Sequence, residues 1–204
     1  MTSPETGAIV LVGPMGAGKT SIGRRVARDL GVGFSDTDKI VVRDHGPIPQ
    51  IFVELGEAHF RELEHHAAAE ALRAGGVVAL GGGAILDART RSLLETHRVV
   101  LLTVSPQTVA GRLHGDDRPL LAGDDALERW HRIWTERRPL YDSVADVTFD
   151  TSRGPLSRVV DAVTAWVRAT AAPSTSPPTA CATTTTPRYS PTTAVSSRSS
   201  KESS

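Results

Sequence analysis

The segment Gly13–Thr20 (GPMGAGKT) has the residue types and spacing of a phosphate-binding loop. An apolar, β-branched run precedes this segment and a helical pattern follows it, as the motif requires. Glycines let successive backbone N–H groups converge on phosphate oxygens, while Lys19 reaches the β- and γ-phosphates and the Thr20 hydroxyl is a ligand for Mg²⁺. The sequence therefore predicts a site for a magnesium-bound nucleoside triphosphate, with contacts from Gly16, Ala17, Gly18, Lys19, Thr20 and Ser21.

Two carboxylates two residues apart, Asp36 and Asp38, follow in the segment Phe34–Asp38. If this segment is one short strand, both side chains point to the same side, toward the crevice at the carboxyl ends of a parallel sheet. One carboxylate can then hold the metal through water while the other orients an acceptor hydroxyl or accepts its proton. Taken alone, the pattern favours a solvated turn, and the phosphate loop is what makes it a candidate active site.

These residues must be positioned by the elements that the apolar pattern marks out. Apolar runs alternate with helical patterns, which indicates a mostly parallel sheet covered by helices on both faces. The expected strands are Ala8–Val12, Phe34–Asp38, Val77–Leu80, Val99–Val104 and Val147–Asp150, and the expected helices are Lys19–Leu30, Glu57–Arg73, Pro106–Leu113, Asp124–Arg138 and Pro155–Arg168.

Composition excludes several classes of protein. The 204 residues carry 23 basic and 23 acidic groups, a balance without a signal for nucleic acid or an anionic membrane. We expect residues 1–170 to fold as one domain and residues 171–204, mostly Ser, Thr and Pro, to be a disordered tail. The only cysteine, Cys181, lies in that tail, which excludes an internal disulfide or a thiolate metal site in the folded part. Met1–Gly7 does not resemble a signal peptide and no apolar run reaches membrane-spanning length, so we expect a cytoplasmic protein.

A series of motifs extends along the chain from the phosphate loop onward. They are GPMGAGKTSIGR (Gly13–Arg24), SDTDK (Ser35–Lys39), IFVELGEAHFRELE (Ile51–Glu64), LGGGA (Leu80–Ala84), DRPLL (Asp117–Leu121) and RRPLY (Arg137–Tyr141). Together these motifs resemble the shikimate kinase family, which belongs to the nucleoside-monophosphate-kinase-like P-loop proteins, and the resemblance covers about residues 8–168. It implies an α/β fold, a three-layer α/β/α P-loop kinase with a central, mostly parallel five-stranded sheet, a substrate-binding helical subdomain (residues 36–64) and a mobile lid (residues 112–124).

The resemblance also implies a role for each matching residue. Asp38 would bind the hydroxyls of shikimate and orient or deprotonate the attacking 3-hydroxyl. Asp36 would hold Mg²⁺ through water, next to Thr20. Arg61 and Arg137 would clamp the substrate carboxylate, to which a planar guanidinium offers two parallel hydrogen bonds.

Further residues complete the implied site. Glu64 lies one helical turn from Arg61 and would fix its rotamer. Gly82, with Gly83 beside it, would let the backbone approach the substrate because no Cβ intervenes. Arg118 matches a lid arginine that closes over ATP and stabilises the transferring phosphoryl group. The arginines that the family places near the nucleotide base are matched more loosely, by Arg112 and Arg153.

The implied reaction transfers the γ-phosphoryl group of MgATP to the 3-hydroxyl of shikimate, giving shikimate 3-phosphate and ADP in chorismate and aromatic amino-acid biosynthesis. Lys19, Mg²⁺ and Arg118 would carry the catalysis, in a monomer whose partners are ATP and shikimate and neither nucleic acid nor a membrane. Two alternatives stay open: another small P-loop kinase, acting on gluconate or a nucleoside monophosphate, and a nucleotide-binding module without catalysis.

Overall fold

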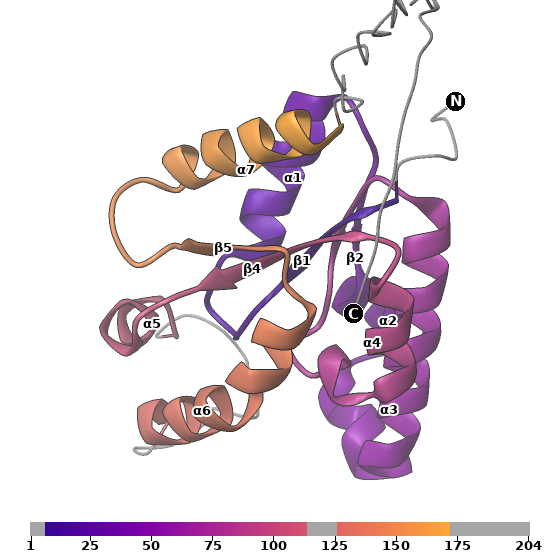
Figure 1. The fold of residues 1–204 in the computed structure, drawn as a ribbon. Coiled ribbons are helices and arrows are strands. Elements are labelled where there is room, and N and C mark those ends of the chain that lie inside the picture. Colours follow the sequence, from indigo (N-terminus) through magenta and orange to yellow (C-terminus); the bar gives the residue numbers. More distant parts are fainter. Residues whose placement is uncertain (1–6, 114–125, 172–204) are drawn as a thin grey trace, which may run out of the picture. The chain divides into compact units, whose positions relative to one another are not determined.

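A sheet of five parallel strands lies at the centre of the computed structural model, which describes residues 7–113 and 126–171 (Figure 1). The strand order is β2-β3-β1-β4-β5, and every neighbouring pair is parallel. This confirms the predicted sheet. The strands are β1 (Ile9–Val12), β2 (Phe34–Asp36), β3 (Val77–Ala79), β4 (Arg98–Thr103) and β5 (Val147–Asp150).

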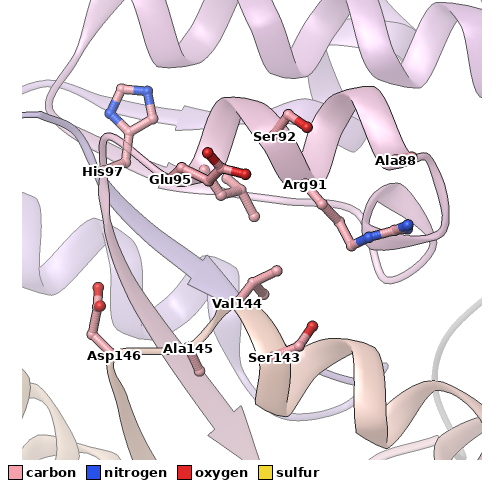
Figure 2. A pocket seen from close by; sticks show the side chains of 10 residues that line it. Ala88, Arg91, Ser92, Glu95, His97, Ser143, Val144, Ala145 and Asp146 are labelled. Carbon is pink, nitrogen blue, oxygen red and sulfur yellow. The ribbon is translucent and has the colours of Figure 1, made fainter.

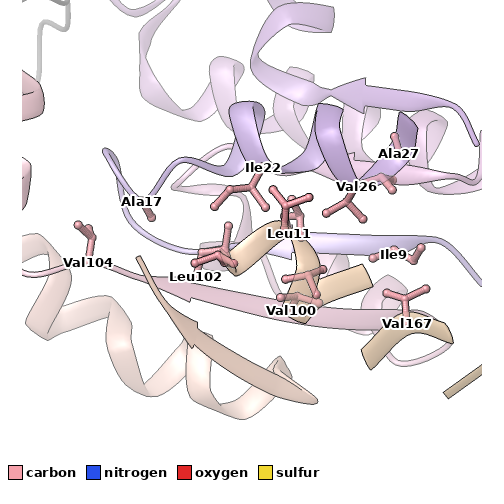
Figure 3. Close-up of a cluster of buried hydrophobic side chains, with 14 of the residues drawn as sticks. Ile9, Leu11, Ala17, Ile22, Val26, Ala27, Val100, Leu102, Val104 and Val167 are labelled. Carbon is pink, nitrogen blue, oxygen red and sulfur yellow. The ribbon is translucent and has the colours of Figure 1, made fainter. Parts of the chain in front are cut away.

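Helices cover both faces of this sheet because alternate residues of a strand point to opposite sides. Ile9 and Leu11 of β1 belong to a buried cluster with side chains of α1 and α7 (Figure 3). Val10 and Val12 belong to a second cluster, with side chains of α3, α4 and α6. The fold therefore has the three predicted layers. The helices are α1 (Lys19–Leu30), α2 (Thr37–His45), α3 (Ile48–Ala74), α4 (Ala88–Leu94), α5 (Pro106–Leu113), α6 (Ala126–Val144) and α7 (Leu156–Ala171), with a short 3₁₀ turn at Ala84–Leu86.

The prediction that Asp36 and Asp38 share one strand is wrong. Strand β2 ends at Asp36, and Asp38 lies in the first turn of α2. The reason is local, because Asp36 is the N-cap residue of α2 and its carboxylate accepts a hydrogen bond of 3.3 Å from the Lys39 amide. A capping carboxylate satisfies one of the amide groups that the first helical turn leaves without a partner, so it favours the start of a helix directly after it.

Two predicted helices are longer than expected. Helix α3 begins at Ile48 rather than at Glu57. An additional helical segment precedes the predicted one, and the two are separated by a break at Gly56, whose backbone has φ 80° and ψ 170°. Helix α6 continues beyond Arg138 and through Pro139. Its last turns contain Tyr141, which is 1% exposed, and burial of this aromatic ring stabilises turns that a proline would otherwise weaken.

Part of the predicted domain organisation lies outside the described residues. Of the predicted lid, residues 112–124, only positions 112 and 113 are described, as the end of α5, and Arg118 is not. Of the predicted tail, only Ala171 is described, as the last residue of α7. Among the helices that the structure describes, none is both long and apolar enough to cross a membrane.

Candidate active site

The phosphate loop follows the carboxyl end of β1 and leads into α1. Gly13, Gly16 and Gly18 have φ values of 139°, 79° and 85°, a region that residues with a Cβ rarely adopt. The Lys19 ammonium group donates to the Gly13 carbonyl at 2.7 Å and to the Pro14 carbonyl at 3.0 Å. The loop therefore has the left-handed turns that expose backbone N–H groups, and its own carbonyls hold the lysine at the start of the helix.

Thr20 and Asp36 meet at the nucleotide end of the site. The Thr20 hydroxyl donates to the Asp36 carboxylate at 2.7 Å, so two hard oxygen donors lie side by side. Mg²⁺ prefers oxygen ligands and is typically held by one or two protein groups together with phosphates and water. Among residues 7–113 and 126–171 there is no group of three or more carboxylate, imidazole or thiol ligands. The pair of oxygens fits a metal that a nucleotide brings with it.

A cleft of about 770 Å³ extends from the phosphate loop across α2 and α3. It joins segments that are far apart in the sequence, because the loops after β1, β2 and β3 all lie at the carboxyl edge of the sheet. Three basic side chains line the cleft, Lys19 from the phosphate loop, Arg61 from α3 and Arg137 from α6. Its lining includes these predicted site residues: Gly16, Gly18, Lys19, Thr20, Ser21, Asp36, Asp38, Arg61, Gly82, Gly83 and Arg137.

Arg61 is held by two carboxylates of its own helix. Its guanidinium donates to Glu64 at 2.6 Å and to Glu57 at 2.9 Å. Burial alone would lower the pKa of Arg61, but the Glu64 and Glu57 carboxylates together outweigh it and the pKa is raised. Glu64 is only 3% exposed, and burial raises the pKa of its carboxyl although Arg61 opposes the shift. The contact between Glu64 and Arg61 occurs at the spacing from which it was predicted, whereas the contact of Glu57 with Arg61 was not predicted.

The glycines after β3 are required by the side chains around them. A Cβ at Gly81 would collide with the Asp38 and Glu64 carboxylates, and a Cβ at Gly83 would collide with the Arg61 guanidinium. At Gly82 the nearest protein atoms to such a Cβ are 3.9 Å away. Among the protein atoms described, a side chain would therefore collide at Gly81 and Gly83 but not at Gly82.

Replacing Gly83 by Ala is expected to raise the KM for the substrate that Arg61 binds by about tenfold. The new methyl group displaces the guanidinium from Glu64, whereas the backbone at Gly83, with φ −103°, accepts alanine without strain. Steady-state kinetics with each substrate varied in turn measures the effect. Gly33→Ala is the matched control because a Cβ at Gly33 meets nothing within 4 Å. An unchanged KM in Gly83→Ala contradicts the packing argument.

Helix α6 reaches both sides of the cleft. Arg137 donates to the Gly82 carbonyl at 3.0 Å, and the Trp130 indole N–H donates to the Met15 carbonyl of the phosphate loop at 2.9 Å. The Tyr141 hydroxyl lies 2.6 Å from the Gly82 carbonyl oxygen. Sequence reasoning missed the contacts of Trp130 and Tyr141, because aromatic residues at helical spacing are more typical of a core.

The predicted contacts to the nucleotide base are not all brought to the cleft. Arg153 is exposed in the turn between β5 and α7 and lies outside the cleft lining that the described residues form. Arg112 belongs to α5. The turn itself is anchored, because the Ser152 hydroxyl accepts from the Ser105 amide at 2.7 Å and the Thr108 hydroxyl donates to the Ser152 carbonyl at 3.1 Å.

A second cavity of about 520 Å³ lies between α4 and the end of α6 (Figure 2). Its charged groups already serve the fold. Arg91 donates to the Ile85 carbonyl at 2.7 Å, Asp146 accepts from the Val99 amide at 2.7 Å, and His97 accepts from the Ala8 amide at 3.0 Å. The contacts of Asp146 and His97 lie at the amino ends of β4 and β1, away from the edge where parallel sheets bind ligands.

Comparisons with known proteins agree with this arrangement. The family model described as shikimate kinase matches residues 15–168. Shikimate kinase of Corynebacterium efficiens is 47% identical over 156 residues, 75% of this chain and 92% of the relative. The structure of shikimate kinase from Acinetobacter baumannii in complex with shikimate has a TM-score of 0.77 at 35% identity, covering 81% of this chain and 95% of that one. A gluconokinase from Sinorhizobium meliloti 1021 has a TM-score of 0.57 at 22% identity, covering 83% and 95%, a likeness of fold alone. The shikimate kinase model matches most of this chain, and the relative from Corynebacterium efficiens is 47% identical to it. The chain therefore belongs to the shikimate kinase family.

Proposed function

We propose that the cleft transfers the γ-phosphoryl group of MgATP to the 3-hydroxyl of shikimate, giving shikimate 3-phosphate and ADP for aromatic amino-acid biosynthesis. The observation that carries the proposal is the distribution of charge along one cleft. The phosphate loop with Lys19, the two arginines Arg61 and Arg137, and the carboxylate of Asp38 all line it. Such a site suits an acceptor that carries both a carboxylate and a hydroxyl.

In this proposal each residue has one task. Arg61 and Arg137 bind the shikimate carboxylate, and Asp38 orients the 3-hydroxyl or accepts its proton. Lys19 stabilises negative charge on the transferring group, which is where most of the rate acceleration arises in phosphoryl transfer. Arg118, outside the described residues, is assigned to the same charge, and residues 112–124 to a lid that excludes water. Arg112 and Arg153 are assigned to the nucleotide.

Thr20 and Asp36 are the residues that would hold Mg²⁺, Thr20 directly and Asp36 through water. The metal supplies charge neutralisation between the β- and γ-phosphates when it is bound with ATP. The distance of 2.7 Å between the Thr20 hydroxyl and the Asp36 carboxylate supports this assignment, because both oxygens are available on one side of the phosphate loop.

Replacing Asp36 by Asn is expected to raise the Mg²⁺ concentration needed for the half-maximal rate by about tenfold, as loss of an outer-shell carboxylate typically does. Asparagine keeps the N-cap of α2, so the helix is preserved while the charge is removed. Titration of free Mg²⁺ at saturating ATP and shikimate measures the shift, with Asp44→Asn at the exposed end of α2 as control. An unchanged Mg²⁺ dependence contradicts the assignment.

A coupled assay of ADP release with shikimate, gluconate and nucleoside monophosphates tests the proposed function. The expected result is release of ADP with shikimate alone. A preference for gluconate or a nucleoside monophosphate overturns the substrate, and binding of ATP without turnover of any acceptor overturns the activity.

We further propose that the chain acts as a monomer in the cytoplasm. One chain supplies both ends of the cleft, and ATP is a cytoplasmic donor. Residues 172–204 are proposed to have no part in the reaction, since they include none of the residues assigned to ATP, the metal or shikimate. Sedimentation of the full chain, and the same assay after deletion of residues 172–204, test these points.

A further inference from the structure

Tyr141 connects the two loops that form the ends of the cleft. Its hydroxyl oxygen lies 2.6 Å from the Gly82 carbonyl and 3.2 Å from the Gly13 carbonyl. Gly13 begins the phosphate loop after β1, and Gly82 belongs to the loop after β3, the strand that pairs directly with β1. One hydroxyl group therefore joins the nucleotide side of the site to the acceptor side.

The hydroxyl is buried, and beside two carbonyl oxygens it can act only as a donor. It has one proton, and the shorter distance favours donation to the Gly82 carbonyl over the Gly13 carbonyl. Tyr141 is 1% exposed, and burial raises the pKa of its hydroxyl well above the usual range, so the group stays protonated. Loss of the hydroxyl removes one of the hydrogen bonds that the Gly82 carbonyl accepts at a buried position. Because the Tyr141 hydroxyl stays protonated, it can donate to these carbonyls throughout the pH range of an assay.

The Gly82 carbonyl is also a contact of Arg137, whose guanidinium donates to it at 3.0 Å. Tyr141 and Arg137 lie one turn apart in α6 and share this acceptor. The Gly13 carbonyl in turn accepts from Lys19 at 2.7 Å. Thus the hydroxyl contacts one carbonyl bound to the phosphate-binding lysine and another bound to the carboxylate-binding arginine.

We propose that Tyr141 is a positioning residue for phosphoryl transfer: its hydroxyl holds the Gly82 carbonyl against the phosphate loop and thereby sets where Arg137 presents the acceptor. The inference rests on the proposed function, since it takes Arg137 as the group that binds the shikimate carboxylate. Small displacements of a bound acceptor from the in-line geometry are costly in rate, so fixing this separation serves the reaction.

Replacing Tyr141 by Phe removes the hydroxyl and keeps the ring that packs on Trp134, with ring centroids 5.7 Å apart. We expect the KM for shikimate to rise about fivefold to tenfold, kcat to fall several-fold and the KM for ATP to change less than about twofold. Trp134→Phe is the matched control, because it alters the packing around Tyr141 and leaves the hydroxyl in place. A rise in the shikimate KM in the control as large as in Tyr141→Phe overturns the proposal.

A double-mutant cycle with Arg137→Ala separates positioning from stability. If Tyr141 acts through Arg137, then Tyr141→Phe changes the shikimate KM by less than about twofold in the Arg137→Ala background. An equal effect in both backgrounds shows that the two residues act independently and overturns the inference. If the unmutated chain does not phosphorylate shikimate, the proposed function fails instead. All variants are compared at a temperature at which circular dichroism shows each of them folded, so a loss of stability does not enter the comparison.

Discussion

Replacing Lys19 by Met is expected to abolish measurable turnover, with kcat falling about a thousandfold or more. In the proposed function, the ammonium group is the positive charge that the phosphate loop presents to the transferring phosphoryl group. Methionine has a similar length and no charge, so the change removes electrostatic stabilisation of the transition state and leaves the volume of the side chain nearly intact. The fold should persist, because the two hydrogen bonds of Lys19 go to carbonyls of its own loop.

Coupled measurement of ADP release at saturating ATP and shikimate gives kcat, and thermal unfolding reports the fold. Lys39→Met is the control, since Lys39 is exposed on α2 and its backbone amide, rather than its ammonium group, contacts Asp36. A variant at position 19 that keeps near-normal kcat would remove Lys19 from the catalytic machinery.

Replacing Arg137 by Ala is expected to raise the KM for shikimate by about 10-fold to 100-fold, while the KM for ATP stays within about twofold. In the proposed function, the guanidinium provides charge-assisted hydrogen bonds to the substrate carboxylate, and alanine provides none. The loop that carries Gly82 should keep its position, because the Tyr141 hydroxyl still donates to the Gly82 carbonyl. The loss is then confined to the acceptor side of the cleft.

Equilibrium binding of shikimate and of ATP, measured separately by calorimetry, complements the kinetics for this variant. Arg138→Ala is the neighbouring control, because Arg138 is exposed and pairs with Asp142 on the outer side of α6. Equal weakening of both ligands in Arg137→Ala would mean that the residue maintains the cleft as a whole rather than holding a carboxylate.

The phosphate end of the cleft could be predicted from sequence because its geometry is local. Gly16, Gly18, Lys19 and Thr20 are near neighbours in one strand, loop and helix, so spacing alone places their backbone and side chains. The parallel sheet was predictable for a similar reason, because β1, β3 and most of β4 are short apolar runs buried on both faces.

The acceptor end depends on contacts between distant segments, and there the sequence was less informative. The pattern of Asp36 and Asp38 did not reveal which residue ends the strand, since that depends on whether the first carboxylate caps a helix. Nor could spacing reveal that Tyr141 contacts Gly13 and Gly82, because the meeting of those loops follows from strand order. Resemblance to a family supplied Arg61 and Arg137, which as isolated residues look like solvated helical charges.

The order of strands in the sheet also bears on how the chain is made. Strand β1 leads into the phosphate loop and is synthesised early, yet Ile9 lies opposite Val77 on one side and Arg98 on the other. Pairing over such separations is slow, because long loops must close before any contact forms. A nascent chain that ends before β4 contains the whole phosphate-binding motif, but it lacks one of the two strands that pair with β1. We therefore expect a ligand of the phosphate loop to stabilise the fold only after β3 and β4 have both been synthesised.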